Sequence, residues 1–128
     1  MQFVKWDCRS GNAGVDRTGE LGWFDFEYCG RRHGAEDTGL LIADEAWPID
    51  LALMLHIVKK TFPSDELRSL EESLDFLCLY IPFHAMWRLA LIIKKVKSRG
   101  WRSKARILER DDVGHHPQFA INLSVKGA

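Results

Sequence analysis

The chain has 128 residues and a mass of 14.7 kDa, the size of one ordinary domain, and we expect residues 1–128 to fold as a single domain. Hydrophobic residues make up 46% of the chain and charged residues 28%, a composition that excludes a disordered or fibrous protein. Lysine plus arginine total 18, and aspartate plus glutamate also total 18. The net charge of the whole chain therefore indicates neither nucleic acid nor an acidic substrate as a partner.

The first third of the chain is rich in glycine, which is typical of short strands joined by turns. We predict a first strand over residues 3–6. Residues 24–28 alternate aromatic and acidic side chains, and this period of two predicts a second strand. The short apolar run 40–43 predicts a third.

The middle of the chain changes to a helical period and predicts three helices, over about 48–62, 64–81 and 82–97. The first of them is apolar nearly all round, which is typical of a central, buried helix. Ser64 is placed to cap the second helix. Gly100 falls just beyond the third, where a left-handed residue commonly ends a helix.

The last thirty residues return to a period of two over 101–107 and 119–125, with turn residues between them. This pattern predicts a β-hairpin with a long loop. The order of strands, then helices, then a hairpin predicts an α+β fold, in which three helices pack on one face of an antiparallel sheet of about five strands.

Residues 74–93 are apolar enough to require a test as a membrane span. Arg88 lies well inside the run, and an arginine at the centre of a membrane helix costs about 2.5–3.5 kcal/mol on insertion scales. Pro82 is expected to divide the run into two shorter helices. We therefore expect two buried helices and no association with a membrane.

The chain contains three cysteines, so at least one of them has no partner within the chain. Cys78 lies in an apolar run and is expected to be a small buried hydrophobic residue. An odd number of cysteines favours a reducing compartment, and the amino terminus lacks the pattern of a signal peptide. We expect a cytoplasmic protein.

No phosphate-binding loop or nucleophile elbow is present in the sequence. The candidate metal ligands are Cys29, His33, His115 and His116, with Cys8 in reserve. They do not form the two well-spaced pairs that structural zinc requires. We predict no metal and no cofactor.

A cysteine nucleophile is the remaining possibility for an enzyme. Cys29 is followed by two arginines that would favour its thiolate, and His33, His56 or His84 could act as the base. Nothing in the sequence marks an oxyanion hole. We therefore predict a protein that is not an enzyme.

Charge is distributed unevenly, because residues 1–93 hold 15 acidic and 9 basic residues, whereas residues 94–128 hold 3 and 9. An acidic cluster with a tryptophan in it is the candidate partner-binding surface. Its members are Glu36, Asp37, Asp44, Glu45, Trp47 and Asp50. Such a surface attracts a basic protein partner, with Trp47 either as the buried anchor of the contact or as a core residue.

A basic run in the last third of the chain supports an alternative function, the binding of nucleic acid. The candidate contact residues are Lys94, Lys97, Arg102, Lys104 and Arg106. The same residues are also explained without nucleic acid, because lysines suit the carboxyl end of a helix and the arginines could pair across a sheet with Asp25 and Glu27. The predicted strand places Trp101 on the side opposite these cations, with the core.

In size and build the chain resembles the small immunity proteins that neutralise bacterial polymorphic and contact-dependent toxins. The resemblance covers the whole chain as a type, a single domain of strands and helices with no catalytic signature, and it includes no shared motif. It implies a bacterial protein that binds a basic toxin or nuclease domain and covers its active surface. We therefore expect an immunity or inhibitor protein, with a nucleic-acid-binding module as the alternative.

Overall fold

The computed structural model describes residues 1–62, 67–110 and 113–128. Within these residues the chain forms two small antiparallel sheets, one 3₁₀-helix and five α-helices. Strand β1 pairs with β4 and strand β2 with β3. The strands are β1 (Gln2–Val4), β2 (Ala13–Val15), β3 (Leu21–Trp23) and β4 (Gly30–Arg32). The helices are η1 (Ser10–Asn12), α1 (Glu36–Ala43), α2 (Leu51–Thr61), α3 (Leu67–Arg99), α4 (Lys104–Arg110) and α5 (Pro117–Lys126).

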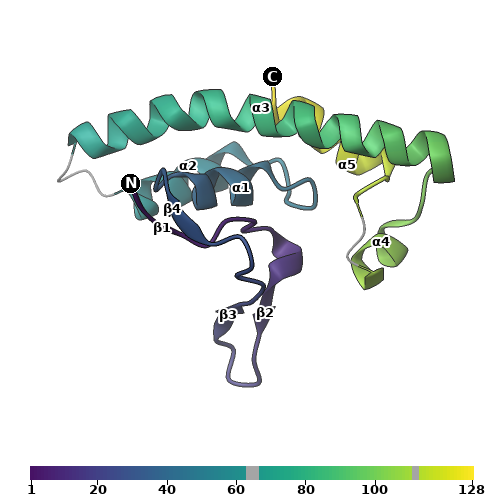
Figure 1. Ribbon diagram of the computed structural model, residues 1–128, viewed down its shortest axis with the longest axis horizontal. Helices are drawn as coiled ribbons and strands as arrows, with labels where there is room; N and C mark the ends of the chain where they lie inside the picture. Colours follow the sequence, from purple (N-terminus) through teal and green to yellow (C-terminus); the bar gives the residue numbers. More distant parts are fainter. Residues whose placement is uncertain (63–66, 111–112) are drawn as a thin grey trace.

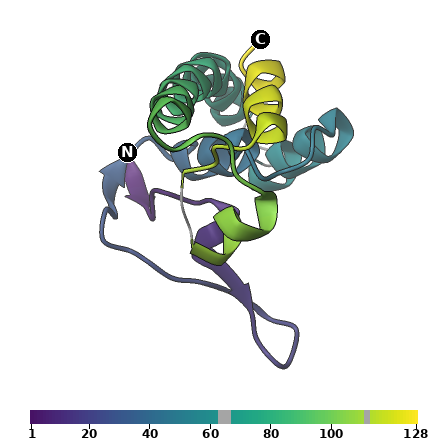
Figure 2. The same cartoon turned by 90° about the vertical axis from the view of Figure 1, so that its right-hand side faces the viewer.

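Helix α3 is the longest element and runs along one edge of the molecule (Figure 1). Helix α1 lies against its first half and α2 lies against α1. Helix α5 lies beside the second half of α3, and the β2–β3 hairpin projects away from the helices (Figures 1 and 2). Two hydrophobic clusters result, and α3 contributes to both. The first is Ala35, Ile42, Val58, Phe62 and Leu77, and the second is Ala85, Ile92 and Leu123.

The expected sheet of about five strands with three helices on one face is wrong, since the structure has four short strands in two separate sheets. Only the first predicted strand, 3–6, overlaps an observed strand that pairs. Residues 40–43 belong to α1, because a short apolar run does not distinguish a strand from a helix. The two carboxylates in the first turn of α1, Glu36 and Asp37, favour the helix.

Residues 24–28 form an exposed loop and not a strand. Asp25 has a φ of 60°, outside the extended region, and its carbonyl accepts a hydrogen bond from the Lys5 ammonium at 2.9 Å. The same ammonium lies 5.1 Å from the centroid of the Phe26 ring. The alternating aromatic and acidic residues therefore belong to a loop that covers Lys5. The predicted pairing of Asp25 and Glu27 with a strand over 101–107 is also wrong, because that strand does not form.

The predicted carboxyl-terminal hairpin is also wrong, because residues 101–107 and 119–125 fall largely in α4 and α5. The start of α5 explains the difference. His116 caps the helix by accepting a hydrogen bond from the Gln118 N–H at 3.0 Å, and proline occupies the first helical position. A strand would bury Ile121 and Leu123 on the same face. In the helix Ile121 is exposed whereas Leu123 is buried.

Pro82 does not divide the apolar run, since α3 continues through it from Leu67 to Arg99. A proline inside a helix removes one backbone hydrogen bond, and tertiary packing on both sides offsets that loss here. Leu77 packs with α1 and α2, whereas Ala85 packs with α5. A Cβ at Gly127 would lie 2.8 Å from the Ala85 Cβ, so the close approach of the chain end to α3 requires glycine.

The carboxyl ends of α2 and α3 were predicted better than the number of helices. Helix α2 ends at Thr61, with Phe62 at its C-cap, and Gly100 follows α3 with a φ of 71°, as the sequence predicts. The start of α2 was misplaced by three residues, because Asp50 is its N-cap and accepts a hydrogen bond from the Leu53 N–H at 3.0 Å. Ser64, the predicted cap of the second helix, lies outside the described residues.

Three burial predictions are wrong, and each follows from the same change of topology. The central helix is α3 and not α2, in which only Val58 is buried. Cys78 is exposed because it lies on the face of α3 away from the buried Leu77. Trp101 is half exposed because no strand places it against the core.

Within the described residues, α3 is the one helix long and apolar enough over Leu70–Arg99 to cross a membrane. The break at Pro82, on which our exclusion of a span partly depended, is absent. Only 17% of the most apolar window of α3 is buried in the fold, so much of this helix presents apolar side chains outward.

Candidate functional site

A cavity of about 480 Å³ lies between the amino-terminal segment, the end of α1 and the middle of α3. We call it the Trp6–Trp87 cavity. Its walls include three aromatic side chains, five charged side chains and one histidine. These are Trp6, Tyr28, Trp87, Asp7, Arg9, Asp44, Glu45, Arg88 and His84. A shallower hollow adjoins the cavity and shares Trp6, His84 and Trp87 with it.

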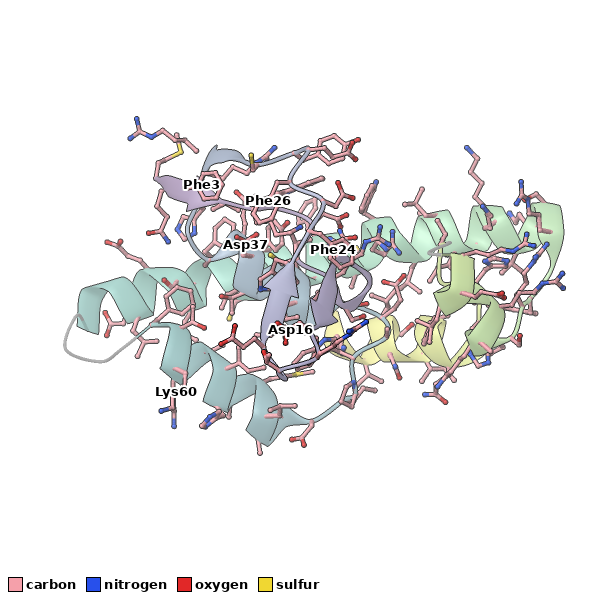
Figure 3. The ribbon with its side chains drawn as sticks, turned by 90° about the horizontal axis from the view of Figure 1, so that it is seen from below. Phe3, Asp16, Phe24, Phe26, Asp37 and Lys60 are labelled. Atoms are coloured by element: carbon pink, nitrogen blue, oxygen red, sulfur yellow. The ribbon has the colours of Figure 1, made fainter. Side chains whose placement is uncertain are left out.

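The amino-terminal wall of the cavity is held by the carboxylate of Asp37, at the start of α1. Its Oδ2 accepts a hydrogen bond from the Lys5 N–H and its Oδ1 accepts one from the Trp6 N–H, both at 2.8 Å (Asp37 is labelled in Figure 3). Trp6 and Asp7 then adopt φ values of 60° and 52°, which non-glycine residues rarely do. The two hydrogen bonds offset this local strain and direct the chain along the cavity.

A second carboxylate, that of Asp44, fixes the segment further along. Its Oδ2 accepts hydrogen bonds from the Ser10 N–H at 2.7 Å and the Ser10 hydroxyl at 2.6 Å, and its Oδ1 accepts one from the Ala46 N–H at 2.9 Å. The Lys126 ammonium donates to the main-chain oxygens of Asp44 and Trp47 at 2.7 and 3.0 Å. Burial lowers the pKa of Lys126 to about 8, although the neighbouring carboxylates oppose this shift.

Glu45 connects the end of α1 to the middle of α3 through a buried ion pair with Arg88. The Arg88 Nε donates to Glu45 Oε2 at 3.2 Å, and the Arg88 Nη2 donates to Glu45 Oε1. The two side chains are 13% and 8% exposed, so little solvent screens their charges. Both side chains of this pair line the cavity.

His84 is part of a row of aromatic rings along α3. The His33 ring stacks on Phe76 with centroids 3.9 Å apart, Phe76 on Tyr80 at 5.2 Å, and Tyr80 on His84 at 6.1 Å. Burial lowers the pKa of His84, and the positive charge of Arg88 lowers it further. His84 is therefore a neutral imidazole at neutral pH. Burial likewise raises the pKa of Tyr80 to about 12.

The structure does not assemble the cysteine–histidine site considered from the sequence. Cys29 is exposed in the loop before β4, and the Nδ1 of His33 accepts a hydrogen bond from the Ala35 N–H at 3.2 Å. Cys8 is buried, and burial together with a hydrogen bond to Asp37 raises its pKa to about 12, so its thiol stays protonated. Among the described residues, no group of three or more His, Cys, Asp or Glu side chains is placed to hold a metal ion.

The acidic cluster predicted as a partner surface makes mostly internal contacts. Asp37, Asp44 and Glu45 hold the amino-terminal segment and α3 as described above. The Oε1 of Glu36 accepts a hydrogen bond from the His33 N–H at 3.3 Å, and its Oε2 lies 3.8 Å from an Arg32 nitrogen. Asp50 caps α2, and Trp47 is half-buried, with its carbonyl bound to Lys126.

The predicted basic residues gather where α3 meets α4. Lys94 and Lys97 are exposed at the end of α3, and Lys104 and Arg106 are exposed on α4. Figure 3 shows side-chain nitrogens concentrated at this end of the molecule. Arg102 is half-buried, and its main-chain N–H donates to the His115 carbonyl at 3.0 Å.

The three aromatic residues of the cavity were not among the site residues predicted from the sequence. Tyr28 was assigned to a strand, and Trp87 was counted among the apolar residues of a buried helix. Trp6 was also assigned to a strand, although it directly precedes Asp7. No sequence signal marks the positive φ angle of Trp6, because tryptophan rarely adopts one, whereas Asp7 is of a residue type that occasionally does.

No family model matches the chain, and neither a curated protein nor a solved structure matches it. The geometry of the Trp6–Trp87 cavity and of the surfaces around it is therefore the basis for the functional argument.

We predict that the two charges of the Glu45–Arg88 pair are strongly coupled. Glu45→Met or Arg88→Met alone should lower the free energy of unfolding by about 3 kcal/mol or more, because each leaves a buried charge without its partner. The double variant should lose less than either single variant. Urea denaturation of the four proteins measures this, and additive losses would contradict it. Arg32→Met, which breaks the more exposed pair with Glu36, should cost about 1 kcal/mol or less.

We predict that His84 makes the fold less stable in mild acid. Its pKa is lowered from the ordinary value of 6.5 in the folded chain, so below pH 6.5 the unfolded chain takes up a proton that the folded chain resists. Stability should therefore fall as the pH drops through this range, and His84→Gln should reduce the slope. The measurement is the urea midpoint between about pH 7 and pH 5. His56→Gln, on the exposed surface of α2, is the control and should leave the slope unchanged.

Proposed function

We propose that this chain is a protein-binding protein and not an enzyme, and that its Trp6–Trp87 cavity receives a basic side chain of the partner. The observation that supports this most strongly is the combination of three aromatic rings and three carboxylates around one open cavity. A guanidinium or ammonium group is attracted by both kinds of side chain.

The charge balance of the cavity favours a cation. Its walls hold the carboxylates of Asp7, Asp44 and Glu45 against the guanidinium groups of Arg9 and Arg88, which leaves an excess of one negative charge. His84 adds no positive charge at neutral pH, because its pKa is lowered.

One of the aromatic rings already binds a cation within the chain. The guanidinium of Arg32 lies 5.1 Å from the centroid of the Trp6 ring. Trp87 and Tyr28, which are each 54% exposed, are open to a similar contact from outside the molecule. Tryptophan and tyrosine are the residues that most often contribute the energy of protein–protein contacts.

An inhibitor or immunity role is the specific form of this proposal. A nuclease or toxin domain that binds nucleic acid presents basic side chains at its active surface. A chain that holds one of those side chains in the Trp6–Trp87 cavity would cover that surface. Exposed thiols at Cys29 and Cys78 are consistent with the reducing, cytoplasmic setting that we propose.

The test is capture of a partner from the source cell by the immobilised chain and by two matched tryptophan variants. We expect Trp87→Ala to lose the captured protein, since removal of a central aromatic anchor costs about 2 kcal/mol or more, roughly 30-fold in affinity. Trp101→Ala should retain it, because Trp101 is similarly exposed but lies outside the cavity. Equal retention by both variants, or the absence of any captured protein, would contradict the proposal.

Nucleic-acid binding remains the second candidate, because four exposed cations of the basic run gather at the end of α3 and on α4. If it is correct, the chain should retain RNA or DNA in filter binding, with an affinity that falls steeply as salt rises. Lys104→Glu combined with Arg106→Glu should weaken retention at least 10-fold, through the loss of two phosphate contacts. The control is Lys59→Glu with Lys60→Glu on α2. Absence of retention at low salt would eliminate this candidate.

A further inference from the structure

The outer face of α3 carries a stripe of exposed apolar side chains. Leu79, Phe83, Met86 and Ile93 are 73%, 72%, 58% and 52% exposed, and they recur at intervals of three, four and seven residues. Residues at these intervals share one face of a helix. Figure 1 shows the other elements gathered on one side of α3. The exposure of the four side chains indicates that they lie mostly on the other side, and Phe83 also borders the shallow hollow beside Trp6. Among the described residues, no buried cluster includes any of the four side chains.

Opposite charges lie at the two ends of this stripe. Asp75 is eleven residues before Met86 and Lys97 is eleven residues after it. Leu79 and Ile93 are each seven residues from Met86. Eleven and seven residues are close to three and two turns of a helix, so these side chains share the face of Met86. Leu79 and Ile93 are therefore equally far from Met86 along the stripe. Asp75 and Lys97 are also equally far from it but carry opposite charges.

From this arrangement we propose that the stripe binds a second copy of the same chain, with the two α3 helices antiparallel and Met86 on the two-fold axis. In this dimer Leu79 of one copy lies opposite Ile93 of the other. Asp75 of each copy lies at the level of Lys97 of the other, so each dimer has two such contacts. A parallel arrangement would instead place like charges together.

The size of the stripe fits a modest dimer. From Asp75 to Lys97 the helix spans about 33 Å, since each residue adds about 1.5 Å. A standard interface buries about 800 Å² on each partner, and a helical stripe about 10 Å wide supplies part of this area. The exposed Ala90, four residues after Met86, lies on the same face and supplies more. We therefore expect a dimer that dissociates on dilution.

The structure favours a second copy over a lipid bilayer as the occupant of this face. A bilayer attracts the lysines at one end of the apolar stripe but gains nothing from Asp75 at the other end, whereas a second copy pairs both charges. The Glu45–Arg88 pair also attaches the opposite side of α3 to α1, and a spanning helix would have to break it. None of the four stripe residues lines the Trp6–Trp87 cavity, although Phe83 borders the adjoining hollow. The dimer and the proposed function can therefore fail separately.

Sedimentation velocity over concentrations of about 1 to 100 µM tests the proposal. The wild-type chain should pass from monomer to dimer in this range. Met86→Lys should weaken the dimer about 100-fold, because two ammonium groups then meet at the two-fold axis. Leu108→Lys, at an equally exposed apolar residue of α4, should leave the dimer unchanged.

Charge reversal gives the sharper test. Asp75→Lys alone and Lys97→Asp alone should each weaken the dimer about 10-fold, since both end contacts become repulsive. The variant with both changes should return to within about 3-fold of the wild type, because the opposite charges again meet. Circular dichroism checks that every variant is folded.

Several results would overturn the proposal. These are a wild-type chain that stays monomeric throughout, an assembly larger than a dimer, or a double charge variant that remains weakened. A monomer that co-sediments with vesicles of phosphatidylcholine and phosphatidylserine would also overturn it, and would indicate that the stripe binds lipid.

Discussion

Two carboxylates at the two ends of α1 determine the course of the amino-terminal segment. Asp37 accepts hydrogen bonds from the N–H groups of Lys5 and Trp6, and Asp44 accepts them from the N–H and hydroxyl of Ser10. Hydrogen bonds to a charged group contribute about 1.5–3 kcal/mol each, which is enough to hold a segment that has only a three-residue strand of its own. The β1–β4 pair, the loop over Lys5 and the wall of the cavity all depend on these contacts.

The same hydrogen bonds to Asp37 and Asp44 explain how a chain with a small core can expose so many aromatic side chains in fixed positions. The amino-terminal segment approaches α3 along the line set by Asp37 and Asp44, and the Glu45–Arg88 pair holds α3 to the end of α1. Trp6 and Trp87 therefore face one cavity from elements distant in sequence. A surface held in place before binding loses less conformational freedom on contact, which favours the protein-binding role that we propose.

The sequence predicted local features well and the topology poorly, for physical reasons that particular residues illustrate. Gly100 and Phe62 end their helices as expected, because the residue at which a helix ends depends mainly on residues near it in the sequence. The alternation in 119–125 suggested a strand, but burial of Leu123 against α3 and the cap at His116 favour a helix. The acidic residues were identified as important, yet nothing in their spacing shows that Asp37 and Asp44 bind backbone N–H groups more than thirty residues away.

Hydrogen exchange of individual backbone amides, followed by NMR, tests the role of these carboxylates most directly. The N–H groups of Lys5, Trp6 and Ser10 should exchange nearly as slowly as those around Ala85 and Ile92 in α3, because carboxylate oxygens hold them. If these three amides exchange at the rate of an unstructured chain while the α3 amides remain protected, the carboxylates do not hold the segment and the account of the cavity is contradicted.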